Sequence, residues 1–310
     1  MTRELSRGQQ VVYEEKMLTL PITEVPKDPN RSTQNAVSPF RYPGGKGFLS
    51  AFLKRRMSLL DTSAERVFAE PFCGGAGAAL ILLADGDADV VRLNDADLRI
   101  FSAWQAILDE PERFVAKLRE VRLDMPEWYH HRDLVAGFSD REYDFDIGFS
   151  TFYMNRTTRS GIILNAGPIG GYDQRGKWKL NARFNVERLA NQVLWLAANR
   201  ARIELSNMDA LSFIDRGRRR ADSGNTMFFI DPPYVKAGGR LYFDGMSEAK
   251  HVALSDILTS GSVKYWVLTY DDAPLVRQLY KSQNCSTISV NYSLQSKRRE
   301  SEILVEPNYR

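Results

Sequence analysis

The chain has 310 residues, 43% of them hydrophobic and 26% charged, and a formal net charge of +3 at pH 7. Two cysteines exclude a disulfide framework or a cysteine-built zinc centre, and no apolar stretch is long enough to span a membrane. The composition is that of a globular protein with one large or two smaller domains, and its mild positive charge permits a nucleic-acid partner. The first residues lack the apolar segment of a signal peptide, so we expect a cytoplasmic protein.

The first third of the chain predicts an arm followed by alternating helices and strands. Residues 1–37 are polar and contain several prolines, which predicts an arm that is disordered or orders on contact. SPFRYPGGKGFLSAFLKRRM (38–57) predicts a glycine turn and an amphipathic helix. RVFAEPFCGGAGAALILLADG (66–86) predicts a short strand, a glycine-rich turn and an apolar helix, and ADVVRLNDAD (88–97) predicts a second strand that ends in acids.

The rest of the chain predicts a helical insert and a return to strands. Residues 100–202 are mostly helical in pattern, interrupted by an irregular loop rich in glycine, aromatic and basic residues. Strand patterns return at residues 202–207, 226–231, 264–272, 286–294 and 301–306. Strands that alternate with helices predict an α/β fold, with helices on both faces of a parallel or mixed sheet. We therefore expect residues 38–103 and 203–310 to form one α/β domain and residues 104–202 to form the insert.

The glycine-rich turn FCGGAG (72–77) is the first candidate site. Small residues let the backbone approach a ligand closely, and the start of the next helix offers N–H groups to an anion or carboxylate. A tight structural turn is an equally good interpretation. Asp95 follows at about the spacing of an acid that binds ribose hydroxyls, although it could also cap a helix beginning near Ala96. Because the glycines depart from the dinucleotide fingerprint, NAD is not expected.

The turn YPGGK (42–46) is the second candidate site. It resembles part of a phosphate loop but lacks the full GxxxxGK[ST] spacing, so chemistry on a nucleoside triphosphate is not expected. Lys46 could hold a carboxylate of a ligand or of the protein itself, or it could be a solvated turn lysine.

The quartet DPPY (231–234) is the third candidate site. It ends an apolar run that predicts a buried strand, because prolines cannot continue a strand inside a sheet. The Asp231 carboxylate and the Pro232 carbonyl are acceptors, and Tyr234 offers a flat ring. This combination suits an exocyclic amino group on a planar base, with both hydrogens accepted and the nitrogen lone pair directed toward a methyl donor. A proline-rich turn with a capping aspartate is the alternative. The three histidines lack a convincing ligand spacing, so no metal is expected.

In this order, RYPGGK, AEPFCGGAGA, NDAD, NRTTRSGI and FIDPPYV resemble the motifs of Dam-type (alpha-group) adenine-specific DNA methyltransferases, over residues 38 to about 305. The resemblance implies a Rossmann-like methyltransferase sheet plus a smaller, mainly helical target-recognition domain. It also implies S-adenosylmethionine as cofactor and methylation of the adenine N6 amino group in duplex DNA, with base flipping. Methylation of cytosine N4 and a catalytically silent DNA-binding regulator remain alternatives. A cognate restriction nuclease is a possible partner, and a monomer is the default.

The resemblance also implies the roles of individual residues. The catalytic residues would be Asp231, Pro232, Pro233 and Tyr234. The cofactor would contact Tyr42, Lys46, Glu70, Pro71, Phe72, Gly74, Gly75, Gly77, Asp95, Asp209 and Asp231. DNA is expected at the loop 152–185 and at a basic cluster near the C-terminus, through Asn155, Arg156, Arg159, Arg175, Lys177, Lys179, Lys297 and Arg298.

Overall fold

The computed structural model describes residues 38–41, 46–139, 141–235, 246–293 and 297–308, without the side chains of residues 289–300. Its centre is a seven-stranded sheet of order β3-β2-β1-β4-β5-β7-β6. The strands are β1 (Val67–Glu70), β2 (Val90–Asn94), β3 (Ile203–Ser206), β4 (Thr226–Ile230), β5 (Tyr265–Asp271), β6 (Asn284–Ser293) and β7 (Lys297–Glu306). The strands β1 to β5 pair in parallel, whereas β7 is antiparallel to both β5 and β6.

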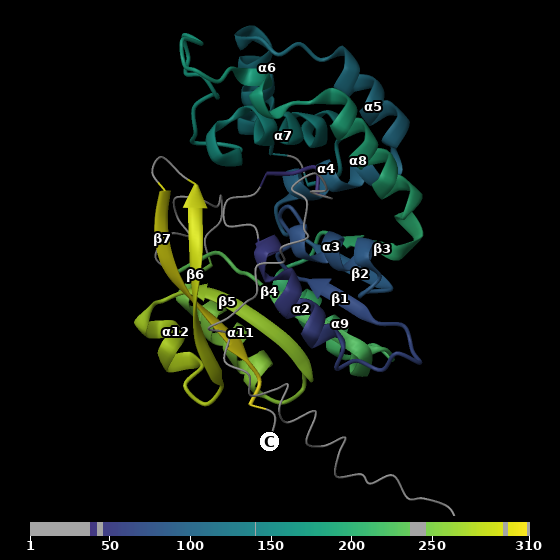
Figure 1. Cartoon of the computed structure of the whole chain (residues 1–310), viewed down its shortest axis with the longest axis vertical. Coiled ribbons are helices and arrows are strands. Elements are labelled where there is room, and N and C mark those ends of the chain that lie inside the picture. The colour runs from purple at the N-terminus through teal and green to yellow at the C-terminus, as the bar shows by residue number, and fades with distance from the viewer. Residues whose placement is uncertain (1–37, 42–45, 140, 236–245, 294–296, 309–310) are drawn as a thin grey trace, which may run out of the picture.

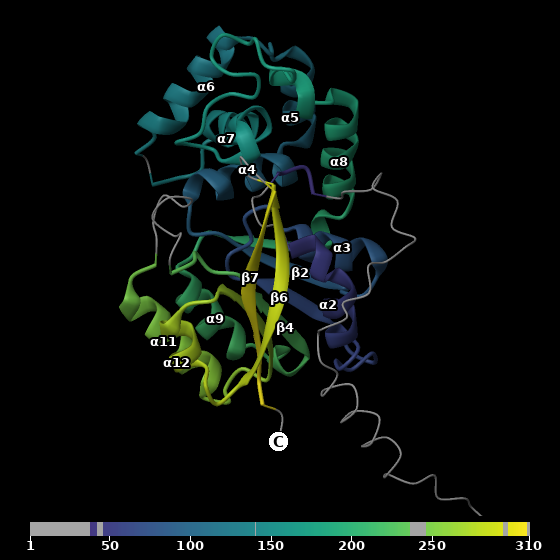
Figure 2. The same ribbon diagram turned by 60° about the vertical axis from the view of Figure 1, so that its left-hand side comes forward.

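Helices cover both faces of the sheet, because successive strand residues bury their side chains on opposite sides. Phe68 and Phe229 pack into the cluster that includes α2 (Ser50–Met57) and α3 (Gly77–Asp85). Ala69 and Phe228 point the other way, into the cluster formed with α9 (Ala210–Arg218), α11 (Glu248–Thr259) and α12 (Pro274–Leu279). The two groups of helices flank the sheet in Figure 2. The predicted Rossmann-like sheet with helices on both faces is thus confirmed.

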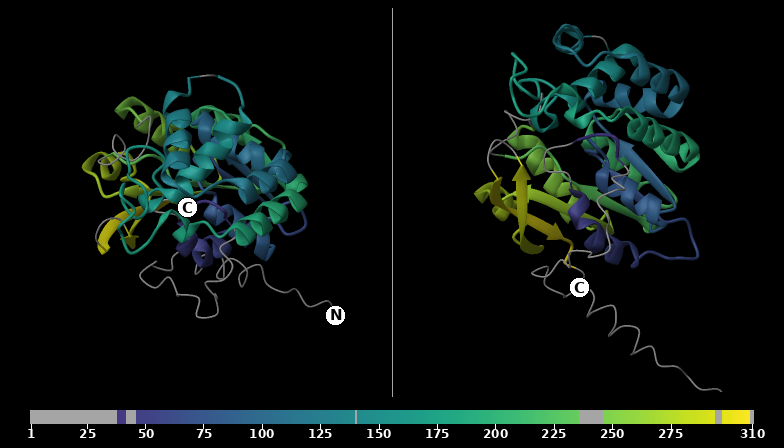
Figure 3. Two further views of the ribbon diagram at one scale, coloured as in Figure 1. Left: turned by 90° about the horizontal axis from the view of Figure 1, so that it is seen from above. Right: turned by 45° about the horizontal axis from the view of Figure 1, so that its top comes forward.

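A separate group of helices lies beyond one end of the sheet (Figures 1 and 3). It contains α4 (Leu98–Asp109), α5 (Pro111–Glu120), α6 (Met125–Gly137), α7 (Phe145–Thr157) and α8 (Val186–Ala198), with short 3₁₀ turns η3 (Arg159–Gly161), η4 (Leu180–Arg183) and η5 (Arg200–Arg202). The long apolar pattern beginning near Trp104 is split into two helices, because Pro111 starts α5 instead of continuing α4. Phe40 packs against both Trp104 and Phe152, so one hydrophobic cluster runs from the sheet into these helices.

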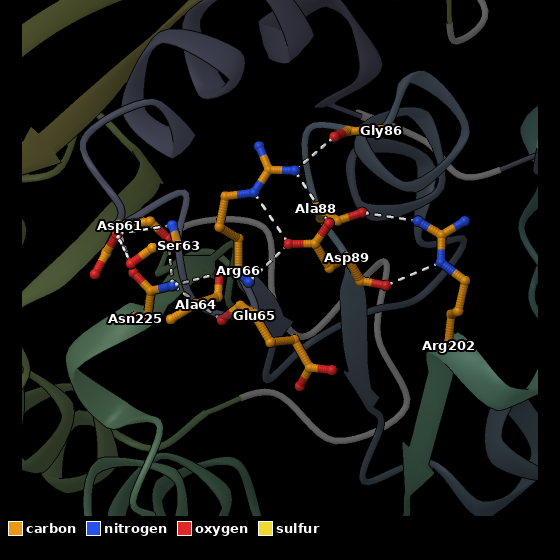
Figure 4. Close-up of polar contacts among 10 residues, drawn as sticks. All are labelled: Asp61, Ser63, Ala64, Glu65, Arg66, Gly86, Ala88, Asp89, Arg202 and Asn225. Carbon is orange, nitrogen blue, oxygen red and sulfur yellow. Dashed lines mark hydrogen bonds and ion pairs between the residues drawn. The ribbon is translucent and has the colours of Figure 1, made fainter.

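Polar side chains join the amino ends of the strands (Figure 4). Asn225, just before β4, donates from its amide to the backbone carbonyls of Asp61, Ala64 and Glu65. Arg66 pairs with Asp89, and Arg202 donates to the backbone carbonyl of Asp89 at 2.9 Å. These bonds anchor the loops at the amino edge of the sheet. The glycine-rich turn and the DPPY quartet lie at the opposite, carboxyl edge, where a ligand can bind. None of the helices in the described ranges has the length and apolar character needed to cross a membrane.

Candidate active site

The DPPY quartet begins where β4 ends, as the sequence predicts. Ile230 is fully buried, whereas the Asp231 side chain is 21% exposed at the rim of the sheet. Thr269, on the neighbouring strand β5, donates from its hydroxyl to Asp231 Oδ1 at 2.7 Å. The Asp231 carboxylate is therefore held at the edge in a fixed direction and is still accessible to a ligand.

Lys46 lies against this quartet. It starts η2 (Lys46–Leu49), is only 5% exposed, and donates from Nζ to Asp231 Oδ2 at 2.9 Å and to the Tyr234 hydroxyl at 2.8 Å. The hypothesis that Lys46 holds a carboxylate of the protein is confirmed, and the alternative of a solvated turn lysine is wrong. A turn far upstream in the chain thereby contributes a cation to the quartet.

Glu302 on β7 completes the same network. Its Oε1 atom accepts from the Tyr234 hydroxyl at 2.6 Å, and Oε2 lies 3.5 Å from Lys46 Nζ. Glu302 is 1% exposed. Neither Glu302 nor Thr269 was expected from the sequence at this site. The available signal for Glu302 was a charged residue inside SEILVE, a strand whose other side chains are mostly apolar.

The glycine-rich turn between β1 and α3 is fixed by contacts from several directions. Gly74 has φ +45°, and Ala76, two residues later, has φ +47°, a left-handed conformation that is uncommon for alanine. Trp104 donates to the Gly74 carbonyl at 2.8 Å, and Ser38 donates to the Gly75 carbonyl at 2.5 Å. A Cβ atom added at Gly77 would meet nothing within 4 Å. The turn is therefore preorganised, with open space at the start of α3.

Asp95 closes this turn from β2. Its Oδ2 atom accepts from the Gly74 backbone N–H at 3.0 Å, and Oδ1 accepts from the Asp97 N–H at 3.0 Å. Burial, followed by the charge of Asp97, raises the pKa of Asp95 to about 7. The expectation that Asp95 caps the next helix is wrong, because α4 begins at Leu98 and its cap is Asp97, which accepts from the Arg99 N–H.

Glu70 ends β1 below the same turn. It is 4% exposed and accepts from the Ala79 N–H, in the first turn of α3, at 3.0 Å. Burial raises the pKa of Glu70 to about 8, and the nearby Asp231 charge acts in the same direction. An acid in such a place is well suited to a cationic ligand, which would favour its ionised form.

Asn94 connects the carboxyl ends of three strands and was not expected from the sequence. Its amide nitrogen donates to the carbonyls of Pro71 at 2.9 Å and Met208 at 3.0 Å. Its amide oxygen accepts from the Met208 N–H at 2.9 Å and from the Ser206 hydroxyl at 2.8 Å. Asn94 thus fixes the loops after β1 and β3 around the end of β2.

Other expected cofactor residues lie at the same carboxyl edge. Phe72 is half-buried and, like Tyr234, packs against the cluster beneath α9 and α11. Asp209 follows β3, caps α9 by accepting from the Leu211 N–H at 3.0 Å, and binds Lys250 at 2.8 Å. Tyr42 lies outside the described residues. In the described part of the chain, no group of three or more histidine, cysteine, aspartate or glutamate residues could hold a metal ion.

The expected DNA-binding residues divide into buried and exposed groups. Asn155 and Arg156 are not in a loop, because α7 continues to Thr157. Asn155 is fully buried, with its amide bonded to the backbone N–H and carbonyl of Arg41 and to the carbonyl of Gly161. The prediction that Asn155 contacts DNA directly is therefore wrong for this conformation. Arg156 is partly buried and donates to the carbonyls of Pro39 and Arg183.

The remaining basic residues are placed differently. Arg159, Arg175, Lys177 and Lys179 are all exposed. Lys297 and Arg298 lie on β7, but their side chains are outside the described residues.

Three comparisons with known proteins were made once this geometry was known. The family model for D12 class N6 adenine-specific DNA methyltransferases matches residues 42–294. Comparison with curated proteins gave no match. Among solved structures, two determinations of the rRNA methyltransferase AviRa from Streptomyces viridochromogenes are similar. One has 12% identity and a TM-score of 0.39, with 93% of this chain and 96% of that chain covered. The other has 13% identity and a TM-score of 0.35, with 86% of each chain covered.

The family match spans both the glycine-rich turn and the DPPY quartet, which the fold brings to one edge of the sheet. The enzymes of this family transfer a methyl group from S-adenosylmethionine to the N6 amino group of adenine in DNA. The resemblance noted in the sequence is confirmed, and the chain belongs to the D12 class N6 adenine-specific DNA methyltransferases.

Proposed function

We propose that S-adenosylmethionine binds at the carboxyl edge of β1, between the glycine-rich turn and the DPPY quartet. The observation that carries this proposal is the strand order. The chain runs from β1 outward to β3 and then returns to β4 on the other side of β1. In open α/β sheets, ligands bind at such a reversal point, outside the carboxyl ends of the strands. Glu70 ends β1 there, and Asp231 directly follows the adjacent strand β4.

Each expected cofactor residue has a role that fits its position. Glu70, with its raised pKa, would take the ammonium group of the methionine part, and Asp95 would take the ribose hydroxyls. Asp209 would reach the adenine of the cofactor. The turn and its surroundings would enclose the methionine part through Tyr42, Lys46, Pro71, Phe72, Gly74, Gly75 and Gly77.

Asp231 and the carbonyl of Pro232 would accept the two N6 hydrogens of the target adenine, with Pro233 stiffening the turn. The base would stack on Tyr234 after leaving the duplex, a step that costs a few kcal/mol. The bound cofactor supplies an electrophilic methyl group on a sulfonium. The N6 lone pair then forms the new C–N bond as the methyl–sulfur bond breaks, and the amine releases one proton. The protein contributes mainly by positioning both partners.

We further propose that residues 158–179 form a preorganised DNA-contacting loop on the helical part of the chain. Gln174 holds the loop from inside, donating to the Ile169 carbonyl at 2.8 Å and accepting from the Leu180 N–H at 3.2 Å. Tyr172 and Trp178 are 60% and 64% exposed, and they alternate along the loop with exposed basic residues. Exposed rings beside lysine and arginine suit contact with bases and phosphates.

The separate positions of the cofactor site and the DNA-contacting loop support our domain assignment. Residues 38–103 and 203–310 would bind the cofactor and carry out the transfer, while residues 104–202 would recognise the target. Residues 1–37 would be a separate arm.

The first experiment is single-molecule sequencing of DNA from cells that express the chain, in parallel with an Asp231→Ala variant. Methyl-adenine within one short sequence, absent in the variant, supports the proposed site. The control Asp215→Ala removes an exposed carboxylate that pairs with Arg218 and Arg219 on α9, and we expect it to keep full methylation. Methyl-cytosine, or undiminished methyl-adenine with Asp231→Ala, would overturn the assignment.

A further inference from the structure

We propose that Glu302 is a positioning residue for methyl transfer, fixing the ring of Tyr234 and sharing Lys46 with Asp231. The inference rests on the proposed roles of Asp231 and Tyr234. It concerns a carboxylate that lies outside all the sequence motifs, on strand β7, which pairs antiparallel with β5.

The register of β5 and β7 places Glu302 next to the quartet. Asp271 on β5 pairs with Glu302 on β7, and both carboxylates bind the end of the DPPY segment. Asp271 Oδ1 accepts from the Val235 backbone N–H at 3.0 Å, while Glu302 accepts from the Tyr234 hydroxyl at 2.6 Å. The tyrosine is thus held at the peptide group that follows it and at the hydroxyl end of its ring. A ring fixed at both ends can present one face to a base with little freedom to tilt.

The tyrosine hydroxyl also connects Glu302 to the cation of the site. It accepts from Lys46 at 2.8 Å and donates to Glu302, and the same lysine bonds Asp231 at 2.9 Å. Lys46 and Glu302 are 5% and 1% exposed, respectively. Because buried charges bond strongly to one another in fixed geometry, displacement of one member moves the others.

Glu302 also affects the charge balance around Asp231. One lysine serves two carboxylates, at 2.9 Å from Asp231 and 3.5 Å from Glu302. Without the Glu302 charge, the ammonium would be attracted more strongly to Asp231, and Asp231 would become a weaker acceptor for an amino group. A buried ion pair adds little net stability compared with apolar packing, so stability alone gives a weak reason for a glutamate at this position.

The test is a double-mutant cycle with Glu302→Gln and Tyr234→Phe, using methyl transfer to DNA that carries the target sequence. Glutamine keeps the shape of the side chain but removes its charge, and phenylalanine keeps the ring but removes the shared hydroxyl. We expect each single variant to lower kcat by about 10- to 100-fold, since small misplacements have effects of this size. The Kd for S-adenosylmethionine should stay within about threefold of the wild-type value, because these changes impair the positioning of the target amine and not the binding of the cofactor.

The double variant should be no more than about threefold slower than the slower single variant, because both changes weaken the same link, one by removing the charge of its acceptor and the other by removing its hydroxyl donor. Glu302→Asp, which restores the charge, should recover part of the lost kcat. The matched control is Glu306→Gln on the same strand, where the buried glutamate pairs with Arg56. We expect Glu306→Gln to lower the unfolding temperature while kcat per folded molecule stays within twofold.

The proposal is overturned if kcat of Glu302→Gln is within twofold of wild type, if the two effects multiply, or if the loss lies only in cofactor affinity. If the Glu302 variants do not fold, Tyr234→Phe still tests the hydroxyl from which Glu302 accepts: a kcat of Tyr234→Phe within twofold of wild type overturns the proposal. Asp231→Ala separates this inference from the proposed function: an active Asp231→Ala enzyme refutes the catalytic site, whereas an inactive one beside a normal Glu302→Gln enzyme refutes only the role of Glu302.

Discussion

Replacing Lys46 by methionine should lower the free energy of unfolding, because Asp231 and Glu302 would then lie side by side as charged groups without this lysine. Methionine keeps most of the apolar stem of Lys46 but removes its charge. The lysine side chain is 4% exposed and the Glu302 side chain 2% exposed, whereas Asp231, at 21%, is partly reached by water. Removing one partner of a buried ion pair costs about 3–5 kcal/mol, and the partial exposure of Asp231 favours the lower end of this range at pH 8.

The loss comes from the two carboxylates that remain. Without the lysine, both lose their attraction to the ammonium and repel each other in a site that is largely closed to water. We expect a deficit of about 3 kcal/mol in the free energy of unfolding at pH 8.

Urea unfolding of wild type and variant at pH 8 measures this deficit. The control is Lys54→Met, because Lys54 is 36% exposed and pairs with Asp85 and Asp87 on the surface. Such a pair contributes about 0–1 kcal/mol, so little change is expected for Lys54→Met. A deficit below 1 kcal/mol for Lys46→Met would refute the reasoning.

Three further predictions concern residues around the site. Because the pKa of Glu70 is raised to about 8 in the fold, Glu70→Gln should have the unfolding temperature of wild type at pH 5 but a higher one at pH 8. The variant should also bind the cofactor more weakly, and a gain in unfolding temperature that does not grow with pH contradicts this prediction. Arg159→Ala should weaken DNA binding and reduce its salt dependence without changing cofactor affinity, and a loss confined to the cofactor would refute the assigned role. Asn155→Ala should lower the free energy of unfolding by about 2–4 kcal/mol, because backbone groups of Arg41 and Gly161 would lose their hydrogen-bond partner. Weaker DNA binding at unchanged stability would instead indicate that Asn155 contacts DNA directly.

The sequence by itself determined the features that depend on neighbours along the chain. The apolar run before Asp231 and the prolines after it specify a buried strand that must end at that residue. In the same way, the small residues after Glu70 specify a turn between strand and helix. These are local consequences of backbone geometry, so no partner from elsewhere in the fold was needed to infer them.

Only the tertiary structure decided which distant side chains meet. Asn155 belongs to a motif that pointed to DNA, yet the last turns of α7 direct it inward to the backbone of Arg41. Lys46, Asp231 and Glu302 come from a 3₁₀ turn, the end of β4 and the antiparallel strand β7. The pairing of β5 with both β4 and β7 brings Asp231 and Glu302 together, and Lys46 contacts both. Strand order and register set such contacts, and both depend on how the whole sheet packs. Local patterns therefore predicted the quartet and offered Lys46 as a cation for a carboxylate, whereas the identity of that carboxylate and the presence of Glu302 became visible only in the assembled fold.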